Sequence, residues 1–272
     1  MRVKPRRREI AKFVAACAFL AFAIVFHLTD GFGSLDVQPK EHLDDYQWGE
    51  LKAIAVKISA APSDDEGLEI AKRYHLCRDD GTIDPANTKT FTLSNDKKTS
   101  ATVQVIGFRH DEKKDGTGMA GITLRFLTSV GEVESGSGAA GWDASDMRAA
   151  MREIDYYNVS NVVTVKKPCA TPVDDGDYDQ ALAEAGYWCL SATECLGSSE
   201  DASVPEEGEQ YQLFREQGAS WDGDNGILST SMTYWLRTVT PDASGFCSVD
   251  YTGSVSTETL GGAHALVVGF CM

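Results

Sequence analysis

A basic segment followed by an apolar run constrains this chain more than any other feature. Residues 1–12 hold six basic residues and one acid, and residues 13–28 then read FVAACAFLAFAIVFHL, without a charge. Crossing a hydrocarbon core takes about 20 apolar residues, with ~17 as the lower limit, which residues 13–29 meet. Because basic residues precede the run and acids follow it, we expect a single-pass membrane anchor with a cytoplasmic amino terminus and an extracellular carboxyl-terminal domain.

Two other interpretations of this segment stay open. Ala21-Phe22-Ala23 has the pattern of a signal-peptidase site, but the apolar run continues past it. Residues 14–17 have the pattern of a lipoprotein box, but almost all of the apolar region follows the cysteine. All three interpretations export the rest of the chain, and we favour the uncleaved anchor. The expected organisation is then a cytoplasmic basic tail (1–12), a transmembrane anchor in the lipid bilayer (13–29), a stalk (30–45) and an extracytoplasmic domain (46–272).

The exported part of the chain, residues 30–272, is strongly acidic. Residues 1–12 contain six of the 25 basic residues and one of the 41 acidic residues, which leaves 19 and 40 and a net charge of -21. A domain with this charge repels nucleic acid and anionic lipid. We attribute the acidity to solubility at a cell surface, with a site for cations or basic partners as the alternative.

Six cysteines remain in the exported part. An even number of cysteines outside the cytoplasm predicts disulfides, and six cysteines allow 15 connectivities. Two of them fall in predicted strands near the end of the chain and are the first pair to consider, Cys247 with Cys271. No Cys-x-x-Cys and no zinc spacing occurs. The disulfide candidates are Cys77, Cys169, Cys189, Cys195, Cys247 and Cys271.

The order of hydrophobic patterns predicts an α+β domain with a mostly antiparallel sheet, few short helices and long loops. Apolar residues recur at helical steps over residues 46–61, and a second short helix follows residue 63. Strand patterns come next, and they are not interleaved with helices as in βαβ units. The final apolar run, 263–271, is expected to be one central strand. The other expected strands are 89–93, 101–108, 122–130, 158–167, 187–191, 233–237, 246–251 and 254–256.

Residues 141–148, GWDASDMR, join a glycine-rich loop to the start of a short helix. Asp143 or Ser145 can cap this helix, and acids in a first turn suit the helix dipole. Large aromatic residues such as Trp142 and Trp235 usually lie in the core. Arg148 and Arg237 are expected to form structural ion pairs with acids, the candidates being Asp143, Asp146 and Glu194. We therefore predict a structural hub that consists of Trp142, Ser145, Arg148, Trp235 and Arg237.

Several short motifs follow one another along the chain. They are the helix at 48–58, NTKTFTL (87–93), VIGFRHD (105–111), GITL (121–124), GWDASDMR (141–148), WCLSATE (188–194), WLRT (235–238) and GFC (269–271). In this order they resemble one bacterial surface family, catalogued as domain of unknown function 6273. The similarity covers residues 46–272, with a core at about 87–272, and at 266–269 the sequence LVVG replaces the arginine-proline often found there. The resemblance implies export from Gram-positive-like bacteria or their phages, suggests a C-type-lectin-like fold, and supplies no activity and no catalytic residue.

The best candidate for a ligand-binding site is the polar loop WDGDNG at residues 221–226. Carboxylates and an amide from Asp222, Asp224 and Asn225 can bind calcium, the one cofactor that the sequence suggests, and Trp221 can stack on a sugar. An ordinary turn is the competing interpretation.

Two weaker candidates for a site are also present. His110-Asp111-Glu112 can hold an acid/base pair or a metal, against a polar turn after a strand. The acidic run at 174–179 has some of the spacing of a calcium loop, and a solvated loop is favoured there.

The pattern of residues favours a non-enzymatic surface module that binds a ligand or partner, either a glycan or a protein. The exported part contains no phosphate-binding glycine loop, HExxH, GxSxG or SxxK motif. One alternative is an extracytoplasmic enzyme acting on cell-wall or glycan material, and another is a purely structural envelope protein. A deep pocket lined by His110, Asp111 or paired loop carboxylates would favour the enzyme.

Overall fold

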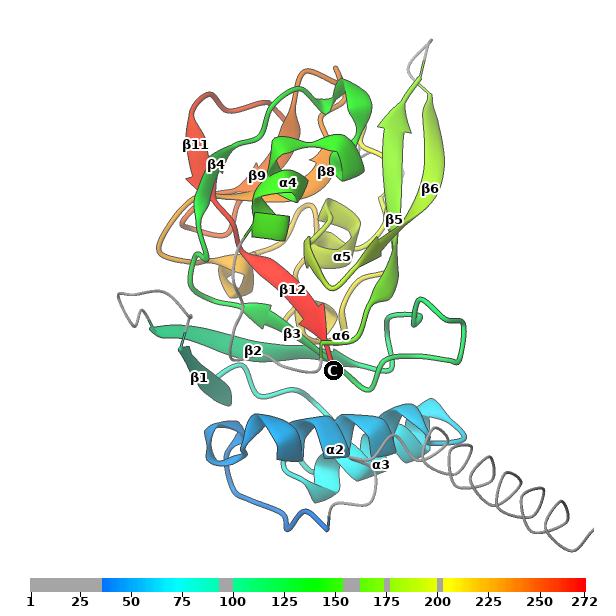
Figure 1. Cartoon of the computed structure of the whole chain (residues 1–272). Coiled ribbons are helices and arrows are strands. Elements are labelled where there is room, and N and C mark those ends of the chain that lie inside the picture. Colours follow the sequence, from blue (N-terminus) through cyan, green and yellow to red (C-terminus); the bar gives the residue numbers. More distant parts are fainter. Residues whose placement is uncertain (1–35, 93–99, 154–161, 174–176, 200–202) are drawn as a thin grey trace, which may run out of the picture.

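Two helices lie beneath one five-stranded sheet, and a second five-stranded sheet and a two-stranded hairpin lie beyond it (Figure 1). The structure is a computed structural model that describes residues 36–92, 100–153, 162–173, 177–199 and 203–272. Among the described strands, pairing is antiparallel except for one parallel position between β8 (Tyr234–Val239) and β11 (Ala263–Ala265). The predicted α+β class with mostly antiparallel sheets is confirmed.

The helical layer consists of α2 (Trp48–Ser59) and α3 (Asp64–Arg73). The first of these helices buries Leu51, Ile54 and Ile58 on one face. The second begins at Ser63, whose side chain accepts a hydrogen bond from the backbone N–H of Glu66. A Cβ added to Gly121 would lie 1.9 Å from the carbonyl oxygen of Ala55, so glycine allows the closest approach between α2 and the sheet.

The predicted stalk, residues 30–45, needs a correction in its second half. Residues 36–45 pack on the domain and include the short helix η1 (Leu43–Asp45). Val37 and Leu43 are buried, and the backbone N–H of Leu43 donates to Asn87 Oδ1 at 2.8 Å. The polar composition of this segment concealed its two apolar anchors. The folded unit therefore includes residues 36–45, and residues 30–35 lie outside the described part.

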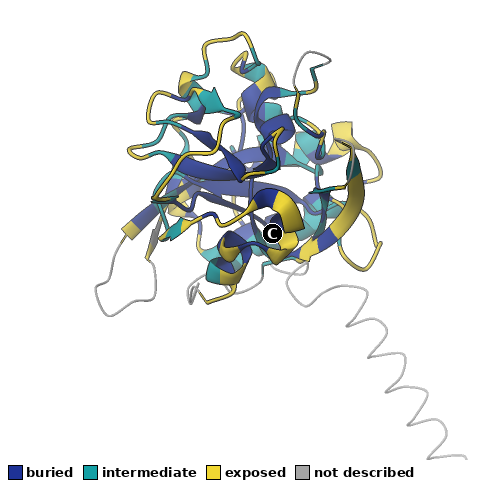
Figure 2. Cartoon of the chain, turned by 90° about the horizontal axis from the view of Figure 1, so that it is seen from above, coloured by how far each residue is buried: buried dark blue, intermediate teal, exposed yellow. Residues whose placement is uncertain are grey.

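The first sheet has the strand order β1-β2-β3-β12-β7, and the second has the order β10-β9-β8-β11-β4. All five residues of β3 and all six of β8 are buried. Figure 2 shows the buried residues gathered in the interior and the exposed residues along the outer loops. The remaining strands are β1 (Thr88–Thr92), β2 (Ser100–Phe108), β12 (Val268–Cys271), β7 (Tyr187–Cys189), β10 (Val255–Ser256), β9 (Phe246–Val249) and β4 (Glu132–Glu134).

The final apolar run is not one strand, as we predicted, but two strands in different sheets. β11 belongs to the second sheet and β12 lies in the first, between β3 and β7. Leu266 stands between them, with its N–H donating to Gly131 and its carbonyl accepting from Val130. Because every residue from 265 to 271 is buried, the run carries no periodic signal that would mark the crossover.

A strand was expected over 158–167, but the hairpin of β5 (Val165–Pro172) and β6 (Tyr178–Ala185) was not predicted from the sequence. Most of β6 is exposed, so its polar residues read as a loop. Of the acidic run at 174–179, Tyr178 and Asp179 belong to β6, and residues 174–176 lie outside the described part. The remaining helices are α4 (Asp146–Glu153), α5 (Ala192–Leu196), α6 (Gln212–Glu216), η2 (Gly138–Ala140), η3 (Trp142–Ala144) and η5 (Gly226–Leu228).

The disulfides expected from the cysteine count are not formed. All six cysteines of the exported part, Cys77, Cys169, Cys189, Cys195, Cys247 and Cys271, are described and buried, and each is a free thiol. The first pair that we considered, Cys247 with Cys271, is not formed. The Cys247 thiol lies 3.9 Å from the carbonyl oxygen of Val239, and the Cys271 thiol lies beside Thr123 and Asp111. Burial raises the pKa of the Cys247 thiol to about 12, which disfavours the reactive thiolate.

The predicted membrane anchor, residues 13–29, lies outside the described residues, as does the basic tail. In the part of the chain that the structure describes, no helix has the length and apolar character needed to span a bilayer.

Candidate functional site

The residues of the GWDASDMR stretch form a packed support. Trp142 is fully buried. Ser145 Oγ accepts from the backbone N–H of Arg148 and donates to the carbonyl of Trp142, so it caps α4. The Arg148 guanidinium lies over the Trp142 ring, pairs with Asp143 at 3.3 Å, and donates to the carbonyls of Glu184 and Tyr187. The two Arg148 contacts with backbone carbonyls therefore tie α4 to the β5–β6 hairpin and to β7.

The second half of the predicted hub leads into the protein interior. Trp235 is buried, and its indole N–H donates to the carbonyl of Val133 at 2.8 Å. Arg237 is also fully buried, and it pairs with Glu194 at 2.6 Å. Its other guanidinium contacts are the carbonyls of Pro168, Cys189 and Glu207. Four acceptors surround the planar fork, a geometry that lysine cannot reproduce.

The predicted ligand loop at residues 221–226 is held mainly by its own contacts. Trp221 is half-buried against the core, and its indole N–H donates to the carbonyl of Gly197. Both polar atoms of the Asn225 amide bond the backbone of Ser220. Asp224 accepts from the N–H of Gly226. Only Asp222 extends freely into solvent, so the four predicted residues do not converge on one ligand position.

The largest concentration of chemistry lies elsewhere, in a group of buried charged residues that we call the charge cluster. Its members come from the loop after β2, from β5, from α5, from the loop before α6 and from β8, and none is more than 3% exposed. They are Asp111, Lys167, Glu194, Glu207 and Arg237.

Lys167 lies at the centre of the charge cluster. Its Nζ is 2.6 Å from Asp111 Oδ1, contacts Glu194 Oε1, and donates to the hydroxyl of Tyr211 at 3.0 Å. The ring of Trp188 lies against it, with the centroid 4.6 Å from Nζ. Lys167 thus sits between two carboxylates and two aromatic rings.

Asp111 accepts hydrogen bonds at both of its oxygens. Thr123 Oγ1 donates to Oδ2 at 2.7 Å, and Tyr211 donates to the carboxylate at 3.1–3.2 Å. The thiol of Cys271 lies 3.4 Å from Oδ2. The carboxylate is therefore fully satisfied within the fold.

Burial and pairing act in opposite directions on the pKa values of these groups. Burial raises the pKa of the Asp111 carboxyl, but the charge of Lys167 lowers it further, and the net effect is a lowered pKa. For Lys167 burial lowers the pKa, while Asp111 and Glu194 raise it to above its usual value. Burial raises the pKa of Glu194, and Arg237 and Lys167 together lower it more. These three groups are therefore charged.

Glu207 is the exception in the charge cluster. Burial raises its pKa to about 7, and the charge of Arg237 offsets only part of this effect. Its carboxyl accepts from the N–H of Ala170 and from the hydroxyl of Thr238. With Glu207 protonated, two cations balance two anions and the charge cluster is neutral.

A pocket of ≈ 330 Å³, which we call the His110 pocket, adjoins the charge cluster. Asp111, Lys167 and Glu194 are part of its lining. The rest of the lining includes apolar, acidic and basic side chains, namely Met119, Pro168, Leu182, Glu112, Lys166 and Glu209.

His110 contributes an imidazole ring to the lining of this pocket. The ring packs on Tyr211, with centroids 4.2 Å apart, and both ring nitrogens are buried without a hydrogen-bond partner among the described residues. The 3.6 Å distance from Nδ1 to Asp111 Oδ1 is too long for a hydrogen bond. A second pocket of ≈ 440 Å³ shares His110, Met119 and Glu209 and continues past Asp64 and Arg215.

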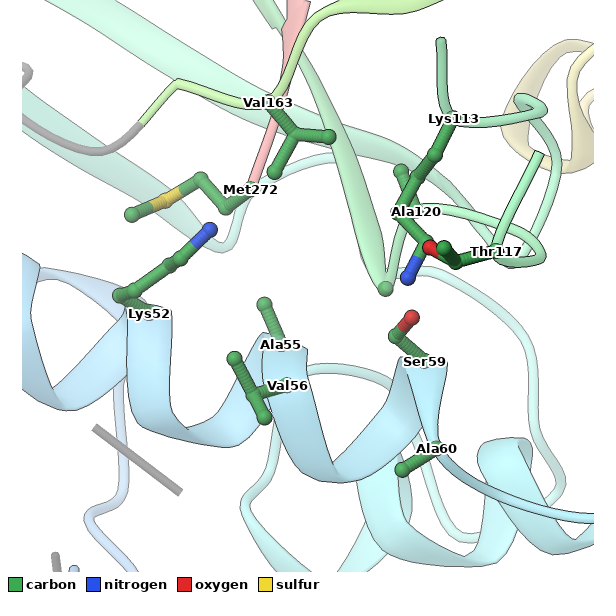
Figure 3. A pocket seen from close by; sticks show the side chains of 11 residues that line it. Lys52, Ala55, Val56, Ser59, Ala60, Lys113, Thr117, Ala120, Val163 and Met272 are labelled. Atoms are coloured by element: carbon green, nitrogen blue, oxygen red, sulfur yellow. The ribbon is translucent and has the colours of Figure 1, made fainter. Parts of the chain in front are cut away.

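A third cavity, of ≈ 220 Å³, lies between α2 and the first sheet (Figure 3). Lys52 and Lys113 extend into it, and no acidic side chain of the described residues lines it. The hydroxyl of Ser59 is already committed to the carbonyl of Met119 at 2.6 Å. This cavity is a gap between packed layers, and it offers fewer available groups than the His110 pocket.

Among the described residues, no group of three or more His, Cys, Asp or Glu is arranged to hold a metal ion. Calcium binding at residues 221–226 stays a prediction. Comparisons with known proteins found no matching family model, no similar curated protein and no similar solved structure.

The sequence named His110 and Asp111 as a weak candidate and Glu194 as a possible partner of Arg237, but it did not predict the part played by Lys167 or Glu207. Lys167 lies 56 residues from Asp111, and Arg237 lies 43 residues from Glu194. No local motif spans such separations. Lys167 directly follows a second lysine, so its charge does not stand out from its local sequence.

Proposed function

We propose that this protein is a membrane-anchored extracytoplasmic module that binds a ligand in the His110 pocket. The observation that carries the proposal is the pair of buried His110 ring nitrogens, which have no hydrogen-bond partner among the described residues and belong to a pocket that the paired groups Asp111 and Lys167 also line. Ligand sites combine apolar walls with a few well-placed polar groups. The loop at residues 221–226, which the sequence favoured, lacks such convergence and becomes the secondary candidate.

The pocket lining favours a ligand that carries an amine and a small apolar edge. Glu209 is exposed and makes no ion pair within the described residues, so its carboxylate can receive a cation. Leu182 is 61% exposed at the rim, and Met119 lies nearby in the lining. An amino-bearing glycan or peptide of a cell envelope has this chemistry, and the acidic domain attracts it.

The sequence supports a location for this activity. The anchor predicted at residues 13–29 would hold the domain on the outer face of a cell membrane. The resemblance to domain of unknown function 6273, and the C-type-lectin-like fold that it suggests, belong to this proposal. They are consistent with presentation of a binding groove at a cell surface.

The test compares the two candidate sites on the full-length protein in detergent. Wild type, His110→Ala and Trp221→Ala are measured for binding to a glycan array and to solubilised cell-wall peptidoglycan fragments. We expect His110→Ala to lose at least about tenfold in affinity, or 1.4 kcal/mol, and Trp221→Ala to bind like wild type. Loss on Trp221→Ala alone would move the site to the loop. No binding by wild type would favour the structural envelope protein.

The second candidate function is an extracytoplasmic enzyme. A pocket lined by His110 and Asp111 is the arrangement that would favour it, and that pocket is present. Asp111 is committed to Lys167, Tyr211 and Thr123, so a general acid/base pair would have to use His110 with Glu209. Mass spectrometry of the same cell-wall fragments after incubation with wild type and Glu209→Gln would detect products that only wild type forms.

A further inference from the structure

We propose that Lys167 and Asp111 condense to form an intramolecular isopeptide bond. The amine and the carboxyl group lie 2.6 Å apart, and both side chains are 2% exposed. They come from different elements, β5 and the loop after β2, so the bond would join two parts of the domain. This modification goes beyond ligand binding and does not depend on it.

Glu194 stands where this reaction needs a proton carrier. One of its oxygens contacts Lys167 Nζ, and the other is held by Arg237 at 2.6 Å. The Arg237 pair and the backbone N–H of Ser191 fix the orientation of the carboxylate. Glu194 is therefore a positioned base beside the ammonium group that must lose a proton before it can attack.

The Asp111 carboxylate, which amine attack would convert to an amide, also has hydrogen-bond donors in place. Thr123 donates a hydrogen bond to Asp111 Oδ2, while Lys167 contacts Oδ1. Tyr211 donates to the same carboxylate, and its hydroxyl also accepts from Lys167 Nζ at 3.0 Å. Donors aimed at a carboxyl oxygen stabilise the negative charge that develops when an amine adds to the carbon. The same two hydroxyls thus form a ready oxyanion site.

The reaction balances without any other reactant. Glu194 takes one proton from the Lys167 ammonium, and the freed lone pair forms a bond from Nζ to Cγ of Asp111. Glu194 returns the proton to one carboxyl oxygen, that oxygen takes the second departing proton of the nitrogen, and the C–O bond breaks. The products are a neutral amide and one water molecule. No electron is transferred, and the net charge does not change.

The surroundings favour the condensed product. Two ions buried away from water are costly, and the amide replaces both of them with a neutral group. Fixed proximity removes the entropy loss of bringing two reactants together. The rings of Trp188 and Tyr211 cover Lys167, with centroids 4.6 Å and 5.3 Å from Nζ. The His110 pocket, which Lys167 and Asp111 line, offers the departing water a way out.

The decisive experiment is peptide mapping of the full-length protein by tandem mass spectrometry. Trypsin should release residues 110–113 joined to residues 167–215, with a combined mass lower by one water molecule. A missed cleavage after Lys167 is not diagnostic, because Pro168 follows it. The intact mass should show the same loss. Wild-type protein with both peptides unlinked and the full mass would overturn the proposal.

Two variants test the mechanism. Glu194→Gln keeps the size of the side chain but cannot accept the proton, so the linked peptide should fall at least tenfold. Lys166→Met is the matched control, because the neighbouring lysine pairs with Glu112 near the surface and should leave the link complete. Equal linkage in wild type and Glu194→Gln would remove Glu194 from the mechanism. Loss in Lys166→Met would contradict the assignment to Lys167.

Discussion

The charge cluster and the loop at residues 221–226 are both rich in acids, and they use them in opposite ways. In the charge cluster Asp111 and Glu194 are buried and lie against Lys167 and Arg237. In the loop Asp222 and Asp224 are exposed, and their surroundings are solvent and their own backbone. The loop was predicted as a ligand-binding site because its polar residues are consecutive in the sequence.

This contrast teaches that contiguity in sequence and convergence in space are different properties. An exposed acid keeps its hydration and contributes little to stability through nearby charges. A buried acid has lost its hydration and depends on partners that other segments supply. The predictions below should therefore give large effects in the charge cluster and small effects in the loop.

The largest effect is expected for Arg237→Ala. It would leave Glu194 without its strongest partner and three buried carbonyls without a donor. Breaking a buried pair costs about 3–5 kcal/mol, and we expect a loss near the upper end in urea unfolding. The matched control is Arg215→Ala on the exposed side of α6, with a change within about 0.5 kcal/mol. A loss of under about 1 kcal/mol for Arg237→Ala would contradict the pairing.

The double variant Lys167→Met/Asp111→Asn distinguishes an ion pair from a covalent bond. Removing both charges together from a buried ion pair is often near neutral. Removing a cross-link between residues 56 apart costs about 4 kcal/mol in the chain-entropy treatment. We expect the larger loss, measured as the free energy of unfolding in urea. A change within about 1 kcal/mol would indicate that the bond does not form.

The pH dependence of stability should report on Glu207. The pKa of this carboxyl is near 4.5 in the unfolded chain and about 7 in the fold. Between these values the native state binds more protons, so stability falls as pH rises from about 4.5 to 7, by ~3 kcal/mol. Glu207→Gln should abolish this fall in urea unfolding across that range. The exposed control Glu209→Gln should retain it, and an unchanged slope in Glu207→Gln would assign the fall to another group.

The loop should give the smallest effects. Asp222→Ala is expected to change the free energy of unfolding by less than about 0.5 kcal/mol, because its side chain is solvated. Asn225→Ala removes two hydrogen bonds to Ser220 and should cost ~1 kcal/mol. Thermal unfolding of both variants measures the difference. A large loss for Asp222→Ala would mean that the loop, too, depends on a specific charge contact.

Several features of the fold followed from local patterns. The strand predicted at 101–108 corresponds to β2 (Ser100–Phe108), because its alternating and β-branched residues fit a pleated surface. Of the three acids suggested as arginine partners, Asp143 pairs with Arg148 and Glu194 pairs with Arg237. The β5–β6 hairpin was missed because its outer strand is polar and exposed. The suggested Cys247–Cys271 pair is not formed, and the two thiols lie beside different residues, Val239 in one case and Thr123 and Asp111 in the other.

The sequence alone determined the α+β class and the acidity of the domain, because hydrophobic period and charge are properties of neighbouring residues. It also marked Trp142 and Trp235 for the core by their size. Only the tertiary structure decided which acidic side chains are buried and which basic side chains they pair with. Asp111, Lys167 and Glu194 come together from three separate elements. Their chemistry depends on distances of a few ångströms that no local pattern encodes.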